Sequence, residues 1–156
     1  MKHIISKSCT DAQAYIVPFR AGSPRGVSIV PEIDAAVDLA INGSFGGNLG
    51  ETYAMTLPVG NKLTSIILLG LGADRLSVRD IHTKAAQAFK QAKQLGAKHV
   101  AVMLDQVSEL SESFELFGAL ARLPQLVGYT NSGLKSNPEN KSFEQVAFVT
   151  AADGLD

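Results

Sequence analysis

The sequence predicts an α/β fold with three layers, in which a mixed, mostly parallel sheet is flanked by helices. Three stretches carry this prediction: the apolar run Ser65–Leu69, a helical pattern from Ser77 to Leu95, and a second apolar run, Val100–Leu104. A strand, a helix and a second strand in this order are typical of a parallel βαβ unit. The first run is too continuously apolar for a strand with one wet face, so we expect the sheet to be covered on both sides.

The helix over 77–95 has recognisable ends. Ser77 is a suitable N-cap, Asp80 follows three residues later, and Gly96 supplies a left-handed stop. An apolar stripe with 4-3-4-3 spacing is expected to face the sheet: Ile81, Ala85, Ala88, Ala92 and Leu95.

The remaining elements are read from shorter patterns. Strands are expected at His3–Ser8, Ala14–Phe19, Thr52–Leu57 and Phe143–Thr150, with a turn at Cys9–Asp11, a strand end at Pro58 and a turn over Val59–Lys62. A helix beginning at Pro31 buries Ile33, Val37, Ala40 and Ile41. A further helix is expected within Ser108–Ala121, and the polar stretch Thr130–Ser142 is expected to be a surface loop.

Length and composition bound the class of protein. The 156 residues suit one domain over 1–150, with 151–156 resembling the start of a linker. A net charge of -1 gives no reason to expect nucleic-acid or membrane-surface binding. Cys9 is the single cysteine, no secretory signal begins the chain, and no apolar run approaches the ~18 residues of a membrane span. We expect a cytoplasmic protein.

The chain holds no complete catalytic constellation, so the catalytic and metal residues are predicted to be none. His3, His82 and His99 lack partners at metal-ligand spacing, Cys9 has no adjacent basic group, and no Gly-x-Ser-x-Gly elbow occurs. Two pairs are interpreted as solvated surface groups, each with a functional alternative: Asp34 with Asp38, which could act as paired carboxylates, and Arg20 with Arg25, which could hold an anion.

Glycines mark the one candidate binding feature. Gly46, Gly47 and Gly50 lie in a loop that could bring backbone N–H groups close to a ligand, and Gly70 and Gly72 follow the apolar strand. The loop lacks the Gly-Lys-Ser/Thr ending of a P-loop, and Arg75 stands where a dinucleotide fingerprint requires glycine. We expect Gly70 and Gly72 to let the strand end turn tightly beneath the helix.

Three segments together resemble the N-terminal domain of the leucyl aminopeptidase (cytosol aminopeptidase) family. Phe45–Thr52 is similar to the family's Gly-Glu-Thr segment, and Ile66–Gly72 to its Leu-Val-Gly-Leu-Gly segment. Tyr129 with Lys135-Ser136 is similar to its Tyr-x-Phe-x-x-Tyr-Lys-Ser segment, although Asn131 and Leu134 replace the phenylalanine and the second tyrosine. The resemblance covers about Phe45 to Thr150.

The resemblance implies a macro-like α/β domain placed before a catalytic domain in a hexameric enzyme. In that family two divalent metals (zinc, manganese or magnesium), held partly by an Asn-Thr-Asp-Ala-Glu-Gly-Arg-Leu segment, drive removal of N-terminal amino acids. No such segment occurs here, so no catalytic or metal residue carries over and the chain alone is expected to be inactive, with no cofactor. The alternative is a stand-alone macro-like module that binds ADP-ribose or another phosphate ligand at the five glycines.

Overall fold

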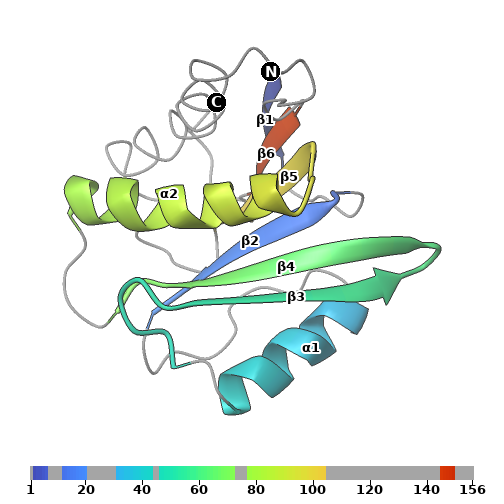
Figure 1. Cartoon of the computed structure of the whole chain (residues 1–156), viewed down its shortest axis with the longest axis horizontal. Helices are drawn as coiled ribbons and strands as arrows, with labels where there is room; N and C mark the ends of the chain where they lie inside the picture. The colour runs from blue at the N-terminus through green and yellow to red at the C-terminus, as the bar shows by residue number, and fades with distance from the viewer. Residues whose placement is uncertain are drawn as a thin grey trace.

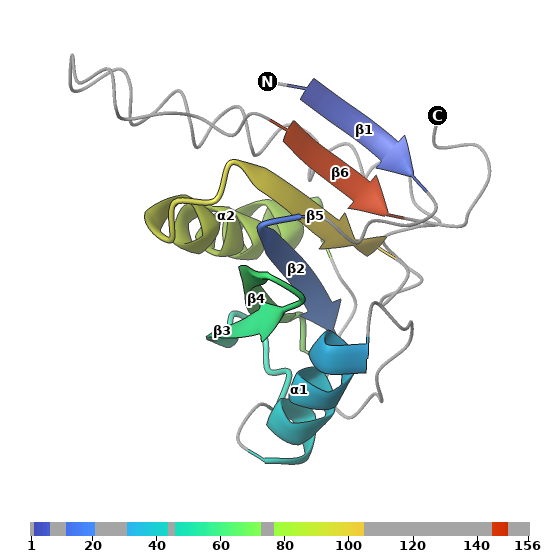
Figure 2. The same cartoon turned by 90° about the vertical axis from the view of Figure 1, so that its right-hand side faces the viewer.

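The computed structural model describes residues 2–6, 12–20, 31–43, 46–72, 77–104 and 145–149. Its six strands form one sheet in the order β1-β6-β5-β2-β4-β3 (Figures 1 and 2). All neighbouring pairs are parallel except β3–β4, which is antiparallel, so the predicted mixed, mostly parallel sheet is confirmed. The elements are β1 (Lys2–Ser6), β2 (Ala14–Phe19), α1 (Pro31–Asn42), β3 (Thr52–Val59), β4 (Lys62–Gly70), α2 (Val78–Gln94), β5 (His99–Met103) and β6 (Gln145–Val149).

The two helices that the structure describes cover opposite faces of the sheet. Side chains alternate along each strand, so Ile67 and Leu69 of β4 belong to one apolar cluster while Ile66 and Leu68 belong to the other. The first cluster is completed by α2 and the second by α1, and Figure 2 shows the helices on different sides of the sheet. The predicted double coverage is therefore confirmed, and it explains why the β4 run has no polar alternation.

The ends of α2 are those that the sequence predicts. The Ser77 hydroxyl accepts a hydrogen bond from the Asp80 N–H at 3.0 Å, and Gly96 follows the C-cap with a φ of 81°. One member of the expected stripe is wrong, because Leu95 is 49% exposed. Leu95 is the C-cap, where the chain leaves the helical path, and Phe89 is fully buried within the stripe instead.

Strand β2 lies between β4 and β5, the two strands that α2 connects. It is parallel to both, which confirms their common direction. Pro18 has no N–H for a second ladder, and pairing between β2 and β5 ends two residues earlier, at Ile16 and Val102. At the amino-terminal end of β2, Gln13 links this strand to the start of β5. Its side-chain oxygen accepts hydrogen bonds from the N–H groups of Lys98 and His99 at 2.6 and 3.2 Å.

Strand β1 pairs with β6 at the far edge of the sheet, so β1 and β2 are not neighbours. The Cys9–Asp11 turn expected between them lies outside the described residues, as do the expected helix within Ser108–Ala121 and the Thr130–Ser142 loop. The last strand is observed at Gln145–Val149, inside the expected range.

The β3–β4 hairpin corrects one prediction, because Pro58 does not end its strand. β3 continues to Val59 and turns through Gly60, whose φ is 61°, into Lys62, as the expected Val59–Lys62 turn requires. The Gly70 N–H donates to the Glu51 carbonyl, and hydrogen-bonded pairs alternate along an antiparallel ladder. By that alternation Pro58 directs its nitrogen away from β4. A proline is tolerated there because β3 is an edge strand.

Candidate functional site

The five predicted glycines come together at the carboxyl end of β4. The residues Gly46–Gly50, here called the glycine loop, pack against the last residue of β4 and the two that follow it. Backbone hydrogen bonds join them: the Gly50 N–H donates to the Gly70 carbonyl at 3.0 Å, and the Gly72 N–H to the Gly47 carbonyl at 2.9 Å. The carboxyl edge of a parallel sheet is where open α/β folds place ligands, so this junction is the candidate site.

Close backbone packing explains why two of these positions are glycine. A Cβ at Gly70 would collide with the carbonyl oxygen of Asn48 and would lie 2.7 Å from the carbonyl carbon of Gly47. Gly72 has a φ of 72°, and a Cβ there would lie 3.2 Å from that of Leu49. Both glycines thus adjoin the glycine loop, while the segment 73–76, which follows them toward the helix, lies outside the described residues.

The carboxylate of Glu51 organises the glycine loop. Its Oε1 accepts hydrogen bonds from the N–H groups of Gly46 at 3.0 Å and Asn48 at 3.1 Å. Two N–H donors around one oxygen form the kind of concavity that binds anions, and here the anion is a side chain of the same chain. Sequence reasoning did not assign this role to Glu51; its signal was an acid directly after a glycine-rich loop.

Most backbone N–H groups of the junction already donate hydrogen bonds to acceptors within the chain. Acceptors within the chain are used by the N–H groups of Gly46, Asn48, Gly50, Glu51, Gly70, Leu71 and Gly72. A phosphate would have to displace Glu51 or bind elsewhere on the loop. The geometry therefore fits a fixed structural junction.

Two cationic side chains lie beside the junction. The Arg20 guanidinium donates to the Leu71 carbonyl at 3.2 Å, which ties the end of β2 to the segment after β4. The Lys84 side chain of α2 lies against Gly50, where its Nζ would be 3.3 Å from an added Cβ. Arg25, the other member of the arginine pair in the sequence, lies outside the described residues.

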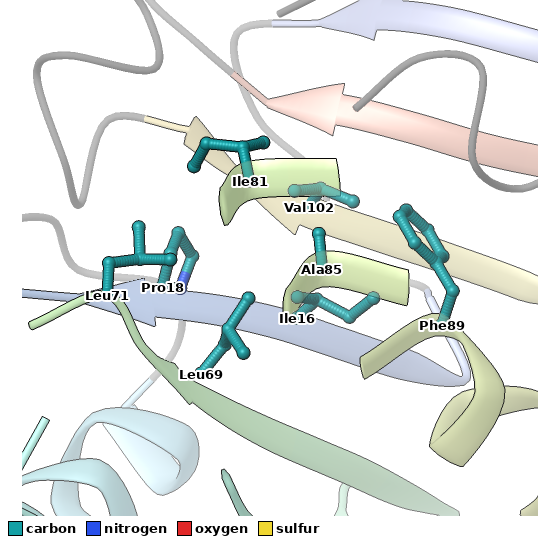
Figure 3. Close-up of a pocket in the computed structure, with 8 residues that line it drawn as sticks. All are labelled: Ile16, Pro18, Leu69, Leu71, Ile81, Ala85, Phe89 and Val102. Carbon is teal, nitrogen blue, oxygen red and sulfur yellow. The ribbon is translucent and has the colours of Figure 1, made fainter. Parts of the chain in front are cut away.

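A small apolar cavity lies between α2 and the sheet, close to the junction (Figure 3). Its volume is about 10 Å³, the space of a single water molecule. The lining is entirely apolar: Ile16, Pro18, Leu69, Leu71, Ile81, Ala85, Phe89 and Val102. A cavity without polar partners does not hold water, and this one is too small for a cofactor.

The other candidate residues that the structure describes lie on different elements. His82 is exposed on α2 and His99 begins β5, while Asp34 and Asp38 lie half-buried on α1. Within the described ranges, no group of three or more His, Cys, Asp or Glu side chains could hold a metal ion. Cys9 lies outside those ranges. The helices described here are also too short or too polar to cross a membrane.

Lys93, near the end of α2, has a side chain whose pKa is shifted by its surroundings. Burial lowers the pKa of its ammonium below the ordinary value of 10.5, because a low-dielectric surrounding disfavours the charged form. Its Nζ is buried and has no hydrogen-bond partner. Lys93 is two residues from the C-cap and is not part of the glycine junction.

Comparison with known proteins adds two kinds of finding. A sequence profile described as the cytosol aminopeptidase family, N-terminal domain, matches residues 34–138. No curated protein sequence matches the chain. Solved structures with the same fold include a mutant of tomato leucine aminopeptidase, at a TM-score of 0.68 and 19% identity, covering 99% of this chain and 33% of that one.

A second solved structure, the bottromycin maturation enzyme BotP in complex with Mn, matches at a TM-score of 0.58 and 15% identity, covering 90% of this chain and 27% of that one. The chain thus spans about a third of the length of these proteins, and the likeness to them is one of fold. The profile match extends over most of the sequence, including the glycine loop and β4. The chain belongs to the cytosol aminopeptidase family and carries its N-terminal domain.

Proposed function

We propose that this chain is the non-catalytic accessory domain of a leucyl aminopeptidase-like metallo-exopeptidase. In this proposal it packs on the parent's own C-terminal catalytic domain and supports a homo-oligomeric, hexameric and cytoplasmic assembly. The observation that carries the proposal is the profile match over residues 34–138. The chain's share of the tomato enzyme, 33%, leaves room in such a protein for a separate catalytic domain.

The chemistry of the described residues supports a structural role. Their titratable side chains form no metal cluster, and the backbone donors of the glycine junction serve internal acceptors. Peptide hydrolysis by two metals requires carboxylates or similar ligands to hold the ions. We therefore assign the two divalent metals (zinc, manganese or magnesium) and the removal of N-terminal amino acids to the parent's catalytic domain, and residues 151–156 to the beginning of the linker.

The test compares the parent enzyme with its separated parts. Leucine release from a chromogenic leucine amide would be measured with added Mn²⁺ or Zn²⁺ for the parent, for this chain, and for the parent lacking residues 1–150. We expect an active parent, an inactive chain, and a truncated enzyme with a smaller oligomer by light scattering. Metal-dependent release by the purified chain, absent from a mock preparation, would contradict the proposal.

The alternative, a macro-like module for ADP-ribose, is favoured by one observation: all five predicted glycines meet at the carboxyl end of β4, next to Arg20 and Lys84. Against it, the Glu51 carboxylate already uses two of the loop's donors. Calorimetric titration with ADP-ribose distinguishes the two. Heat of binding that disappears in Gly70→Ala would favour the alternative, and no heat or thermal shift at millimolar ligand would remove it.

A further inference from the structure

In the part of the chain that the structure describes, β3 is an edge strand of the sheet, and little in its sequence protects that edge. Its eight residues, Thr52–Val59, include no charged side chain, and Pro58 is its one residue of the kind that blocks pairing. Natural sheets usually protect such edges with lysines, prolines or bulges, because unpaired N–H and C=O groups recruit another strand. Tyr53 is 39% exposed on this strand, and Ala54 and Thr56 are exposed as well.

The hydrogen-bond register shows which backbone groups are available. Since Glu51 and Gly70 form a bonded pair and such pairs alternate, Tyr53, Met55, Leu57 and Val59 direct their backbone groups to β4. The alternate residues direct theirs outward. Three of them, Thr52, Ala54 and Thr56, offer both an N–H and a C=O, while Pro58 offers only a C=O.

We propose that this edge binds a second copy of the same chain, β3 to β3, in an antiparallel pair centred on Ala54. An antiparallel strand pair with itself has two-fold symmetry, which is the commonest symmetry of homo-oligomers. In this register Ala54 faces Ala54 of the second copy and Thr52 faces its Thr56, so each outward N–H meets a carbonyl. Pro58 falls beyond the three bonded pairs, and its missing N–H removes none of them.

Other registers are poorer. A pair centred on Thr56 would set Pro58 opposite Ala54 of the second copy and would lose a donor on each side. The Ala54-centred pair also brings no like charges together, since Glu51 of one copy meets Leu57 of the other. On the α1 face, Tyr53 of each copy covers Met55 of its partner copy, a sulfur–aromatic contact.

The predicted association is reversible. A single strand pair buries less area than the roughly 1,200 Å² at which stable interfaces begin, so the chain alone is expected to dimerise only at high concentration. The inference deepens the assembly role proposed above, but its test uses this chain alone. A failure here would leave the activity comparison between parent and truncated enzyme unaffected.

The first experiment compares Ala54→Lys with Ala35→Lys by sedimentation velocity across a dilution series. Ala35 is exposed on α1, so the control adds the same charge away from the edge. Two lysines meeting at the two-fold axis repel, and we expect the dimer dissociation constant of Ala54→Lys to rise at least about tenfold while Ala35→Lys matches wild type. A monomeric wild type at millimolar concentration, or equal effects of the two substitutions, would overturn the proposal.

The second experiment does not depend on how Ala54→Lys folds. In a Cys9→Ser background, Ala54→Cys places two thiols opposite each other, at a Cα separation of about 5.5 Å for a bonded pair, which a disulfide spans. Mild oxidation is expected to produce a disulfide dimer of Ala54→Cys and little of Ala35→Cys, read on non-reducing gels. Equal dimer yields from both variants would show random collision and would reject the β3 interface.

Discussion

The carbonyl oxygen of Asn48 occupies the place that a side chain at position 70 would need. Gly70 ends β4 and Asn48 lies in the glycine loop, so one missing Cβ allows the loop to lie directly on the end of the central sheet.

Gly70→Ala is expected to lower the free energy of unfolding by about 3 kcal/mol, because the new methyl group meets backbone atoms that cannot move aside easily. Gly60→Ala serves as the control: its Cβ would meet no atom within 4 Å, and its cost of about 1 kcal/mol comes from the φ of 61° alone. Urea unfolding of both variants measures the difference. Equal losses would mean that the Asn48 contact is relieved by a small shift of the loop.

Glu51→Ala is expected to lower the free energy of unfolding by about 1 kcal/mol, since the N–H groups of Gly46 and Asn48 lose their common acceptor. Glu51→Gln keeps an amide oxygen and should lose less. Amide exchange by NMR gives a local measurement: exchange at Gly46 and Asn48 should quicken in Glu51→Ala and stay slow at Ile67. Unchanged exchange at these two amides would contradict the role assigned to the carboxylate.

Val102→Ile is expected to raise the free energy of unfolding by about 0.8 kcal/mol, because its extra methyl group enters the small cavity beneath α2. Val100→Ile is a matched control on the same strand and the same face, but Val100 does not line the cavity. Overpacking there should lower stability by about 1 kcal/mol. Thermal unfolding of the two variants tests this prediction. A lower stability of Val102→Ile than of wild type would show that the cavity cannot accept a methyl group.

Lys93→Met is expected to raise the free energy of unfolding at neutral pH by about 1 kcal/mol, since it replaces a buried ammonium that has no partner. The folded-state pKa of Lys93 lies below 10.5, so as the pH rises toward 10.5 the folded chain releases this proton before the unfolded chain does. Wild type therefore regains stability in that window, and the gap to Lys93→Met should narrow.

The control for Lys93 is Lys90→Met, because Lys90 is exposed on the same helix. It should change stability little. Urea midpoints collected from neutral pH to pH ~10 would measure both effects. A gap for Lys93→Met that stayed constant over this range would mean that the ammonium remains solvated.

Local features were the ones that the sequence could predict. The caps at Ser77 and Gly96, the two-sided burial of β4 and the turn at Gly60 follow from residue types within a few positions of one another. The stripe on α2 was right except at Leu95, where the helix ends before the periodic pattern does. The prediction at Pro58 was wrong because a proline is tolerated within a strand when its nitrogen faces an unpaired side. The sequence of the strand does not show which side is unpaired.

The sequence could not predict which distant segments lie next to one another in the sheet. Nothing in the β4–α2–β5 segment indicates that β2, formed some fifty residues before β4, lies between the two strands. The same holds for the site. The sequence shows that these positions are glycine, but it does not show which atoms lie next to them. The contact between Gly70 and Asn48 depends on β3 and β4 folding back on each other.

The pairing of β1 with β6 has a consequence for synthesis. Strand β1 has as its sheet neighbour a strand that ends at Val149, so during synthesis it cannot complete its ladder until β6 and everything between the two strands have emerged. Non-local pairing of this kind is slow, and unpaired strands invite aggregation meanwhile. Until then the backbone groups of Lys2–Ser6 lack their β6 partners, and we expect a chaperone that covers this segment to improve the yield of folded protein.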